Sequence, residues 1–189
     1  MKTKSLFSLL TLLILSIHQA NASGVSLKIR SNDINPSRAI DNKFVFNSFG
    51  CKGENLSPQI SWINIPPRTQ SLALTVFDLD APTGSGWWHW ILLNIPITYK
   101  EIPQGFGTSN RFTINDGISQ IRNDYSAFSY GGPCPPVGDK KHRYVFTIYA
   151  LDTDKINLSD NASSALASFM IRKHTIAKSS MEAFYQRLE

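Results

Sequence analysis

The sequence lacks the marks of several protein classes. It has only two cysteines, no dense run of lysine and arginine, no internal repeat and no low-complexity linker. Two cysteines without the paired spacing of zinc ligands do not make a zinc site. The basic cluster at 140–143 is too short to indicate a nucleic-acid partner, so none is expected. After the first residues, no apolar run is long enough to cross a membrane.

The N-terminus has the order of a secretory signal peptide. Lys2 and Lys4 form a basic start, an apolar run follows at 6–17, and the small-residue stretch Ala20–Ala22 comes next. The alternative is a retained anchor, but the run is short for a bilayer span. We therefore expect a signal peptide at 1–22 and a periplasmic or secreted protein.

Cleavage after Ala22 would leave 189 − 22 = 167 residues, which suits one domain at 23–189 with a substantial core. The formal charge would fall from +5 to +3 with the loss of Lys2 and Lys4. Cys51 and Cys134 would meet oxidising conditions, so a disulfide between them is expected. The alternative is two buried free thiols.

Three segments read as strands, and turn-forming proline and glycine clusters separate them. Ser71–Leu79 alternates apolar and small polar residues, Trp87–Ile95 is apolar on both faces, and Tyr144–Leu151 is rich in β-branched and aromatic residues. Shorter candidates are Phe44–Phe46 and Ile60–Trp62. The pattern predicts a mostly antiparallel β protein.

The C-terminal segment differs from the rest. From Ser163 to Leu188, apolar residues recur at three- and four-residue spacings, which predicts an amphipathic helix, broken near Lys178–Ser180. His174 lies on its apolar face, where a packed role is expected, and a ligand role for His174 or Tyr185 stays open. An exposed apolar helix face would also allow a homodimer.

Polar residues in apolar strands carry the candidate chemistry. Asp78 and Asp80 continue the core-facing row of their strand, where a carboxylate needs a partner, although Asp80 could simply cap the turn. His89 stands among aromatic residues, and a lone core histidine is more often structural. His142 and Tyr144 point to one face of another strand.

The loop Tyr130–Gly138 contains three glycines and three prolines. The glycines permit close backbone approach to a ligand, and the prolines stiffen the loop and remove N–H donors. A rigid turn without a binding role is the alternative.

Taken together, four motifs resemble the phosphatidylethanolamine-binding protein family. They are Gly53–Trp62, Asp78–Pro82, Trp87–Trp90 and Pro135–Tyr144, and they follow the family's order. Pro82-Thr-Gly-Ser-Gly-Trp-Trp-His-Trp is similar to the bacterial YbhB/YbcL branch, the Raf-kinase-inhibitor-like proteins. Two residues depart from the eukaryotic pattern. Leu79 stands where that pattern usually has proline, and Cys134 stands where many eukaryotic members have glycine.

The resemblance implies a large antiparallel sheet packed on a smaller one, with helical elements near the C-terminus. It also implies a small pocket for an anion such as phosphate or a phosphorylated headgroup, with Asp80 and Pro82 supporting the turn beside it. Matching of the motifs predicts these lining residues: Asp78, Trp87, His89, Pro135, Pro136, His142 and Tyr144.

In that pocket we expect His89 and His142 to donate N–H groups to the anion. Asp78 would orient one imidazole, and Tyr144 would donate its hydroxyl. An anion favours protonated imidazole, so acid should tighten binding. No cofactor is expected.

Other functions use the same residues. A metal site could take Asp78, His89 and His142, but they lack a local histidine pair. A hydrolase would need a nucleophile, and no serine here has a nucleophile-elbow pattern. An inhibitor of a protease or kinase, or a factor acting on host cells, is a third reading. We expect a non-catalytic binding protein without a metal, and the alternative is a metal-dependent or other hydrolase.

Overall fold

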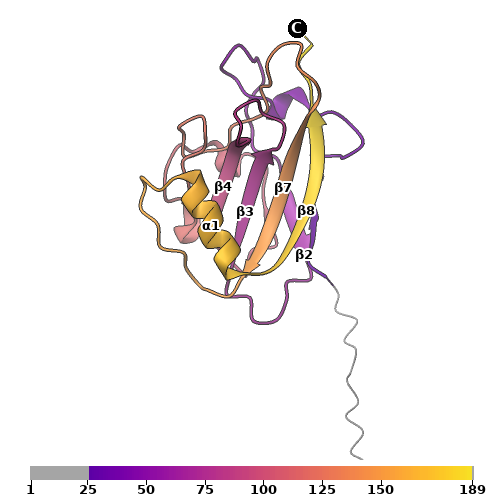
Figure 1. Cartoon of the computed structure of the whole chain (residues 1–189). Helices are drawn as coiled ribbons and strands as arrows, with labels where there is room; N and C mark the ends of the chain where they lie inside the picture. Colours follow the sequence, from indigo (N-terminus) through magenta and orange to yellow (C-terminus); the bar gives the residue numbers. More distant parts are fainter. Residues whose placement is uncertain (1–25, 189) are drawn as a thin grey trace, which may run out of the picture.

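The structure is a computed structural model that describes residues 26–188. These residues form a five-stranded and a three-stranded antiparallel sheet, with an α-helix near the C-terminus (Figure 1). The expected fold class is confirmed. The signal peptide expected at 1–22 lies outside the described residues. Across 26–188, no helix is both long and apolar enough to span a bilayer.

The large sheet has β3 at its centre, between β4 and β7, and β8 lies beyond β7 (Figure 1). Its strands, in spatial order, are β6 (Ser119–Gln120), β4 (Trp87–Pro96), β3 (Ser71–Asp78), β7 (His142–Leu151) and β8 (Thr175–Tyr185). The small sheet contains β1 (Lys28–Arg30), β2 (Ile60–Ile63) and β5 (Glu101–Ile102). The helices are η1 (Asn42–Phe44), η2 (Phe106–Thr108), η3 (Asn115–Gly117) and α1 (Ser164–His174).

Strand alternation divides the core between two faces of the large sheet. Leu72 and Leu74 of β3 pack in one cluster with Ile60 and other residues of the small sheet. Ala73, between them, belongs to a second cluster that includes Ile171 of α1. Full burial of an aliphatic side chain contributes about 1.5–3 kcal/mol. Both faces of β3 are therefore buried, which makes it a rigid platform for the residues at its end.

The predicted helix Ser163–Leu188 is wrong in its second half. The helix α1 ends at His174, and β8 then pairs with β7 along its whole length. Ala177 and Met181 are four residues apart, a spacing that fits one helix face and one strand face equally well. Pairing with the edge of β7 favours the strand. It satisfies the backbone N–H and C=O groups along that edge of β7, which would have no partner if this segment were a helix.

Phe44–Phe46 is not a strand either, since Asn42–Phe44 forms a 3-10 turn. The Asp41 side chain caps this turn by accepting a hydrogen bond from the Lys43 backbone N–H. Phe44 is fully buried there. The apolar residues at Phe44–Phe46 thus indicated a buried segment correctly, but the predicted strand is wrong.

Candidate functional site

The carboxyl end of β3 and the start of β4 and of β7 meet at one edge of the large sheet. Asp78 lies opposite Trp87 of β4 and opposite Tyr144 of β7 in the strand registers. A pocket of about 170 Å³ opens at this edge. Its lining residues are Phe49, Asp78, Ala81, Pro82, Thr83, Trp87, His89, Tyr125, Cys134, Pro135, Pro136 and His142.

The pocket therefore brings together Asp78, Trp87, His89 and His142, with the other predicted lining residues Pro135 and Pro136 in its wall. Tyr144 is 1% exposed and lies beside the pocket rather than on its surface, with its ring edge-on to His89 at 5.1 Å between centroids.

His142 is held between two carboxylates. Its Nδ1 lies 2.7 Å from Asp78 Oδ2, and its Nε2 lies 3.1 Å from Asp139 Oδ2. Burial alone would lower the pKa of His142, but the two carboxylates outweigh burial and raise it. Asp78 thus fixes the orientation of the His142 imidazole. Both ring nitrogens of His142 have carboxylate partners, so in this arrangement neither is free to donate to an anion.

Asp80 supports the turn after β3 from outside the pocket. Its carboxylate accepts hydrogen bonds from the Arg143 backbone and side chain and from Lys140. The Arg143 hydrogen bond holds the pKa of Asp80 well below its ordinary value. The Asp80 backbone N–H in turn donates to Asp78 Oδ1 at 2.8 Å. Both oxygens of Asp78 are therefore engaged.

His89 is 2% exposed and has a different environment from His142. Its Nδ1 lies 2.6 Å from the carbonyl oxygen of Gly131, and its Nε2 has no hydrogen-bond partner in the part of the chain that the structure describes. Burial lowers the pKa of His89 to about 4. The imidazole is therefore neutral at neutral pH.

Buried polar atoms without a hydrogen-bond partner gather at this site. Residues 26–188 contain four such side-chain atoms, and three belong here: Trp87 Nε1, His89 Nε2 and Tyr144 Oη. Burial raises the pKa of Tyr144, which keeps its hydroxyl protonated. Each unsatisfied buried group costs about 1–3 kcal/mol, so their clustering calls for an explanation.

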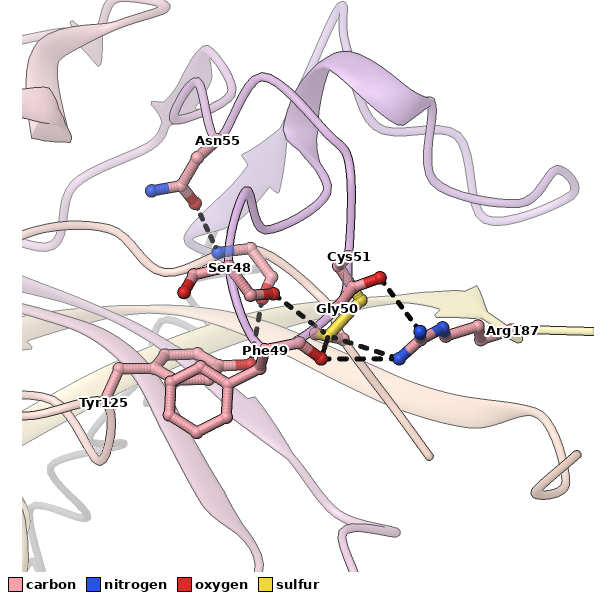
Figure 2. The surroundings of a disulfide bond; sticks show 9 residues. Ser48, Phe49, Gly50, Cys51, Asn55, Tyr125 and Arg187 are labelled. Carbon is pink, nitrogen blue, oxygen red and sulfur yellow. Dashed lines mark hydrogen bonds between the residues drawn. A yellow bond between two sulfur atoms is a disulfide. The ribbon is translucent and has the colours of Figure 1, made fainter. Parts of the chain in front are cut away.

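A disulfide closes one side of the pocket. Cys51 and Cys134 are bonded, as expected, and Cys134 lines the pocket. The bond ties the Pro-rich loop to the segment that carries Phe49, whose ring lies edge-on to Tyr125 at 5.5 Å (Figure 2). Arg187 donates to the carbonyl of Gly50 in this segment at 2.9 Å. Phe49 and Tyr125 thus form an aromatic wall.

The glycines of the 130–138 loop serve the protein's own packing. A Cβ at Gly132 would lie 2.1 Å from the Phe44 carbonyl oxygen, and one at Gly131 would lie 2.4 Å from the Tyr125 ring. We expected these glycines to let the backbone approach a ligand closely. In the structure they let it approach the Phe44 carbonyl and the Tyr125 ring instead. This packing fixes the Gly131 carbonyl opposite His89.

Sequence reasoning missed Phe49, Tyr125 and Asp139. Asp139 stands three residues before His142, a spacing that could have indicated a local pair. Phe49 has a positive φ of 54° in a turn and gives no strand or helix signal. The pairing of His174 with Asp152 at 2.9 Å, on the outside of the protein, places it away from this pocket.

No group of three or more His, Cys, Asp or Glu side chains within 26–188 is arranged to hold a metal ion. In particular, the ring nitrogens of His142 are bonded to carboxylates, and Nδ1 of His89 is bonded to a carbonyl.

Comparisons with known proteins agree with this architecture. The family described as phosphatidylethanolamine-binding protein matches residues 31–186. The Escherichia coli proteins YbcL and YbhB are 39% and 40% identical over 92% and 84% of this chain and 94% and 99% of their own lengths. The crystal structure of E. coli YbcL, described as a new member of the mammalian PEBP family, has a TM-score of 0.82 and 41% identity, covering 85% of this chain and 98% of that one.

Proposed function

This chain belongs to the phosphatidylethanolamine-binding protein family, and we propose that it is a non-catalytic binding protein whose pocket takes a small anion. The ligand is phosphate or a phosphorylated headgroup. The alternative, a hydrolase, uses the same Asp and His residues.

The cluster of unpaired atoms carries the proposal. Trp87 Nε1 and Tyr144 Oη are hydrogen-bond donors, and neither has a hydrogen-bond partner among residues 26–188, although the Asp78 carboxylate lies near enough to raise the pKa of Tyr144. An oxyanion presents several acceptor oxygens at once and would satisfy both. Native proteins leave few buried polar atoms unpaired, so three at one pocket support a ligand that pairs with them.

The size of the pocket supports a small ligand. Its volume of about 170 Å³ is below the roughly 300–1,000 Å³ of sites for drug-sized molecules. Aromatic side chains and prolines make up much of the wall. A single tetrahedral anion with a short substituent suits this space better than a whole phospholipid does.

The bonding of Asp78 and His142 argues against general-base chemistry. A catalytic base needs an unshared acceptor within hydrogen-bond reach of the proton that it removes. Here His142 is bonded at both nitrogens, and Asp78 accepts at both oxygens. This arrangement favours a structural role for these two side chains over a role as general base.

The disulfide supports a location outside the cytoplasm. Disulfides persist in the periplasm and in secreted proteins and are rare in reducing compartments. A protein partner in that compartment, as in an inhibitor or a host-interacting factor, would approach the same open edge. We also propose that the protein can form a homodimer.

Calorimetric titration with inorganic phosphate tests the proposal. Trp87→Phe removes one unpaired donor and keeps an aromatic side chain, and Tyr144→Phe removes the other donor and keeps the ring. Because hydrogen bonds to charged groups contribute about 1.5–3 kcal/mol, each variant should weaken binding at least tenfold.

Matched controls come from the outer face of the same strands. Trp88→Phe and Tyr149→Phe make the same chemical changes next to a separate groove. They should leave the phosphate affinity within twofold of the wild type. No binding by the wild-type protein, or equal losses in both pairs, would refute the proposal.

A further inference from the structure

A second hollow lies on the outer face of the large sheet, the face that α1 partly covers. This outer groove runs between α1 and β8, over β3 and β7, and α1 leaves β8 uncovered beside it (Figure 1). Its volume of about 890 Å³ falls in the roughly 300–1,000 Å³ range of ligand sites. Among residues 26–188, none lines both this groove and the anion pocket. The outer groove is therefore a separate site.

Two walls of similar length border the outer groove. One is the flank of α1 between Ser164 and Arg172, which rises about 12 Å at roughly 1.5 Å per residue. The other is the outward row Lys178, Ser180 and Glu182 of β8, which extends about 13 Å. The groove is thus long enough for an extended chain of about four residues.

One end of the outer groove is basic. Thr175 pairs with Leu151 at the carboxyl end of β7, directly after α1 ends. This junction brings Arg172, in the last turn of α1, to the same end of the groove as Lys178, which lies opposite Tyr149. Two exposed cations therefore stand together there.

The other end of the outer groove is acidic. Glu182 lies opposite Val145 of β7, which in turn lies opposite Phe77 of β3. Trp88 of β4 continues this row, and its backbone N–H donates to the Asp124 carboxylate at 2.7 Å. Both Glu182 and Asp124 line the groove. A carboxylate therefore borders this end on each side.

The charges at the two ends are available to a ligand. No ion pair within residues 26–188 includes Arg172, Lys178 or Glu182. Glu182 acts on the Arg143 guanidinium, but that cation is already bonded to Asp80. A ligand with opposite charges at its two ends would therefore complement the groove.

The middle of the outer groove offers apolar surface and a hydroxyl donor. Phe77 and Val145 form part of its floor, and Phe169 of α1, which is 62% exposed, stands at its wall. Thr147 Oγ1 and Ser180 Oγ lie 2.9 Å apart and share one hydrogen bond. Because each hydroxyl carries one hydrogen, the pair keeps one hydrogen to donate to a ligand. A peptide carbonyl is a suitable acceptor for it.

We infer that the outer groove binds a short extended peptide of about four residues with both termini free. Its carboxylate pairs with Arg172 and Lys178, and its amino group pairs with Glu182. A chain of four residues spans roughly 13–14 Å, which matches the separation of the two ends. A neutral oligosaccharide has no charge for either end, and an anionic lipid surface matches only the basic end. This inference goes beyond the proposed function, because it concerns a different site.

NMR titration of the isotope-labelled protein with the tetrapeptide Ala-Leu-Leu-Ala tests the inference. We expect the backbone amides of β7, β8 and α1 that border the outer groove to shift, while those around the anion pocket do not. N-acetylation or C-amidation of the peptide removes one terminal charge, so each should weaken binding at least fivefold. The dipeptide Ala-Leu reaches only one end and should bind at least tenfold more weakly.

Variants of the two ends test the direction of the peptide. Lys178→Gln should remove most of the effect of C-amidation and keep that of N-acetylation, and Glu182→Gln should do the reverse. Both side chains are exposed, so the substitutions should leave the fold intact. Lys173→Gln is the matched control, because Lys173 is exposed on α1 but does not line the groove. Its peptide affinity should stay within twofold of the wild type.

Several results would overturn the inference. One is the absence of shifts in the groove amides at millimolar peptide, and another is a doubly blocked peptide that binds as tightly as the free one. Shifts produced by chitotetraose or by phosphatidylglycerol vesicles in place of the peptide would assign the groove to another occupant. Saturating phosphate should leave the peptide affinity unchanged, and loss of peptide binding on adding phosphate would contradict a separate site.

Discussion

At the scale of single residues, two histidines of similar burial have pKa values shifted in opposite directions because their partners differ. His89 has one carbonyl partner and an unpaired nitrogen, and its pKa falls to about 4. His142 has carboxylates on both sides, and its pKa rises. Alternation along the strands could predict that both are buried. The partners could not be predicted, because Gly131 and Asp139 reach the site from loops.

Asp78→Asn tests the buried pair. The substitution keeps the shape of the side chain but leaves His142 with one carboxylate partner, and loss of a buried partner costs about 3–5 kcal/mol. We expect denaturant unfolding at pH 6 to show a loss of about 3 kcal/mol. NMR titration should show a lower pKa for His142 than in the wild-type protein.

The pH dependence of that loss has a definite sign. A group whose folded pKa is raised stabilises the protein below its unfolded pKa of about 6.5, and this stability is lost as pH rises through the folded pKa. The stability difference between wild type and Asp78→Asn should therefore narrow as the pH rises through the folded pKa of His142. Asp152→Asn, in an exposed Asp–His pair, should cost under about 1 kcal/mol. Equal losses at the two positions would contradict the account.

At the scale of elements, the sequence predicts the strands whose own residues alternate or are continuously apolar. It does not predict the segments whose structure depends on pairing or capping by another part of the chain. Ser71–Asp78, Trp87–Pro96 and His142–Leu151 agree with the predicted strands to within two residues at either end. Thr175–Tyr185 becomes a strand because β7 has an edge to pair with, which no local spacing reveals. The 3-10 turn at Asn42–Phe44 likewise depends on an Asp41 cap.

The disulfide connects two elements of the pocket, so its removal should affect both stability and binding. It closes a loop across a sequence separation of 83 residues, for which the chain-entropy model gives about 4.5 kcal/mol. Cys51→Ala with Cys134→Ala should lower the free energy of unfolding by about that amount. It should also weaken phosphate binding severalfold, because the Phe49 wall is no longer tied to the Pro-rich loop.

Denaturant unfolding and calorimetry of the double variant measure these two effects. Arg187 still bonds to the Phe49 segment in that variant and should hold part of the wall in place. Unchanged affinity in a folded double variant would mean that the wall does not shape the pocket.

At the scale of the whole molecule, the sequence order of the motifs says little about how they meet. Residues near 78, 89 and 142 converge because β4, β3 and β7 are adjacent in one antiparallel sheet. Family resemblance predicted this convergence, whereas composition and periodicity alone predicted only the strands. The aromatic wall escaped prediction because Phe49 and Tyr125 lie in irregular loops joined by tertiary contacts.

A crystal structure of the protein with phosphate bound tests the central claim most directly. The account predicts the anion in the pocket between β3, β4 and β7, within hydrogen-bond distance of Trp87 Nε1, His89 Nε2 and Tyr144 Oη. Phosphate bound elsewhere at saturating concentration, with these three atoms still unpaired, would contradict it.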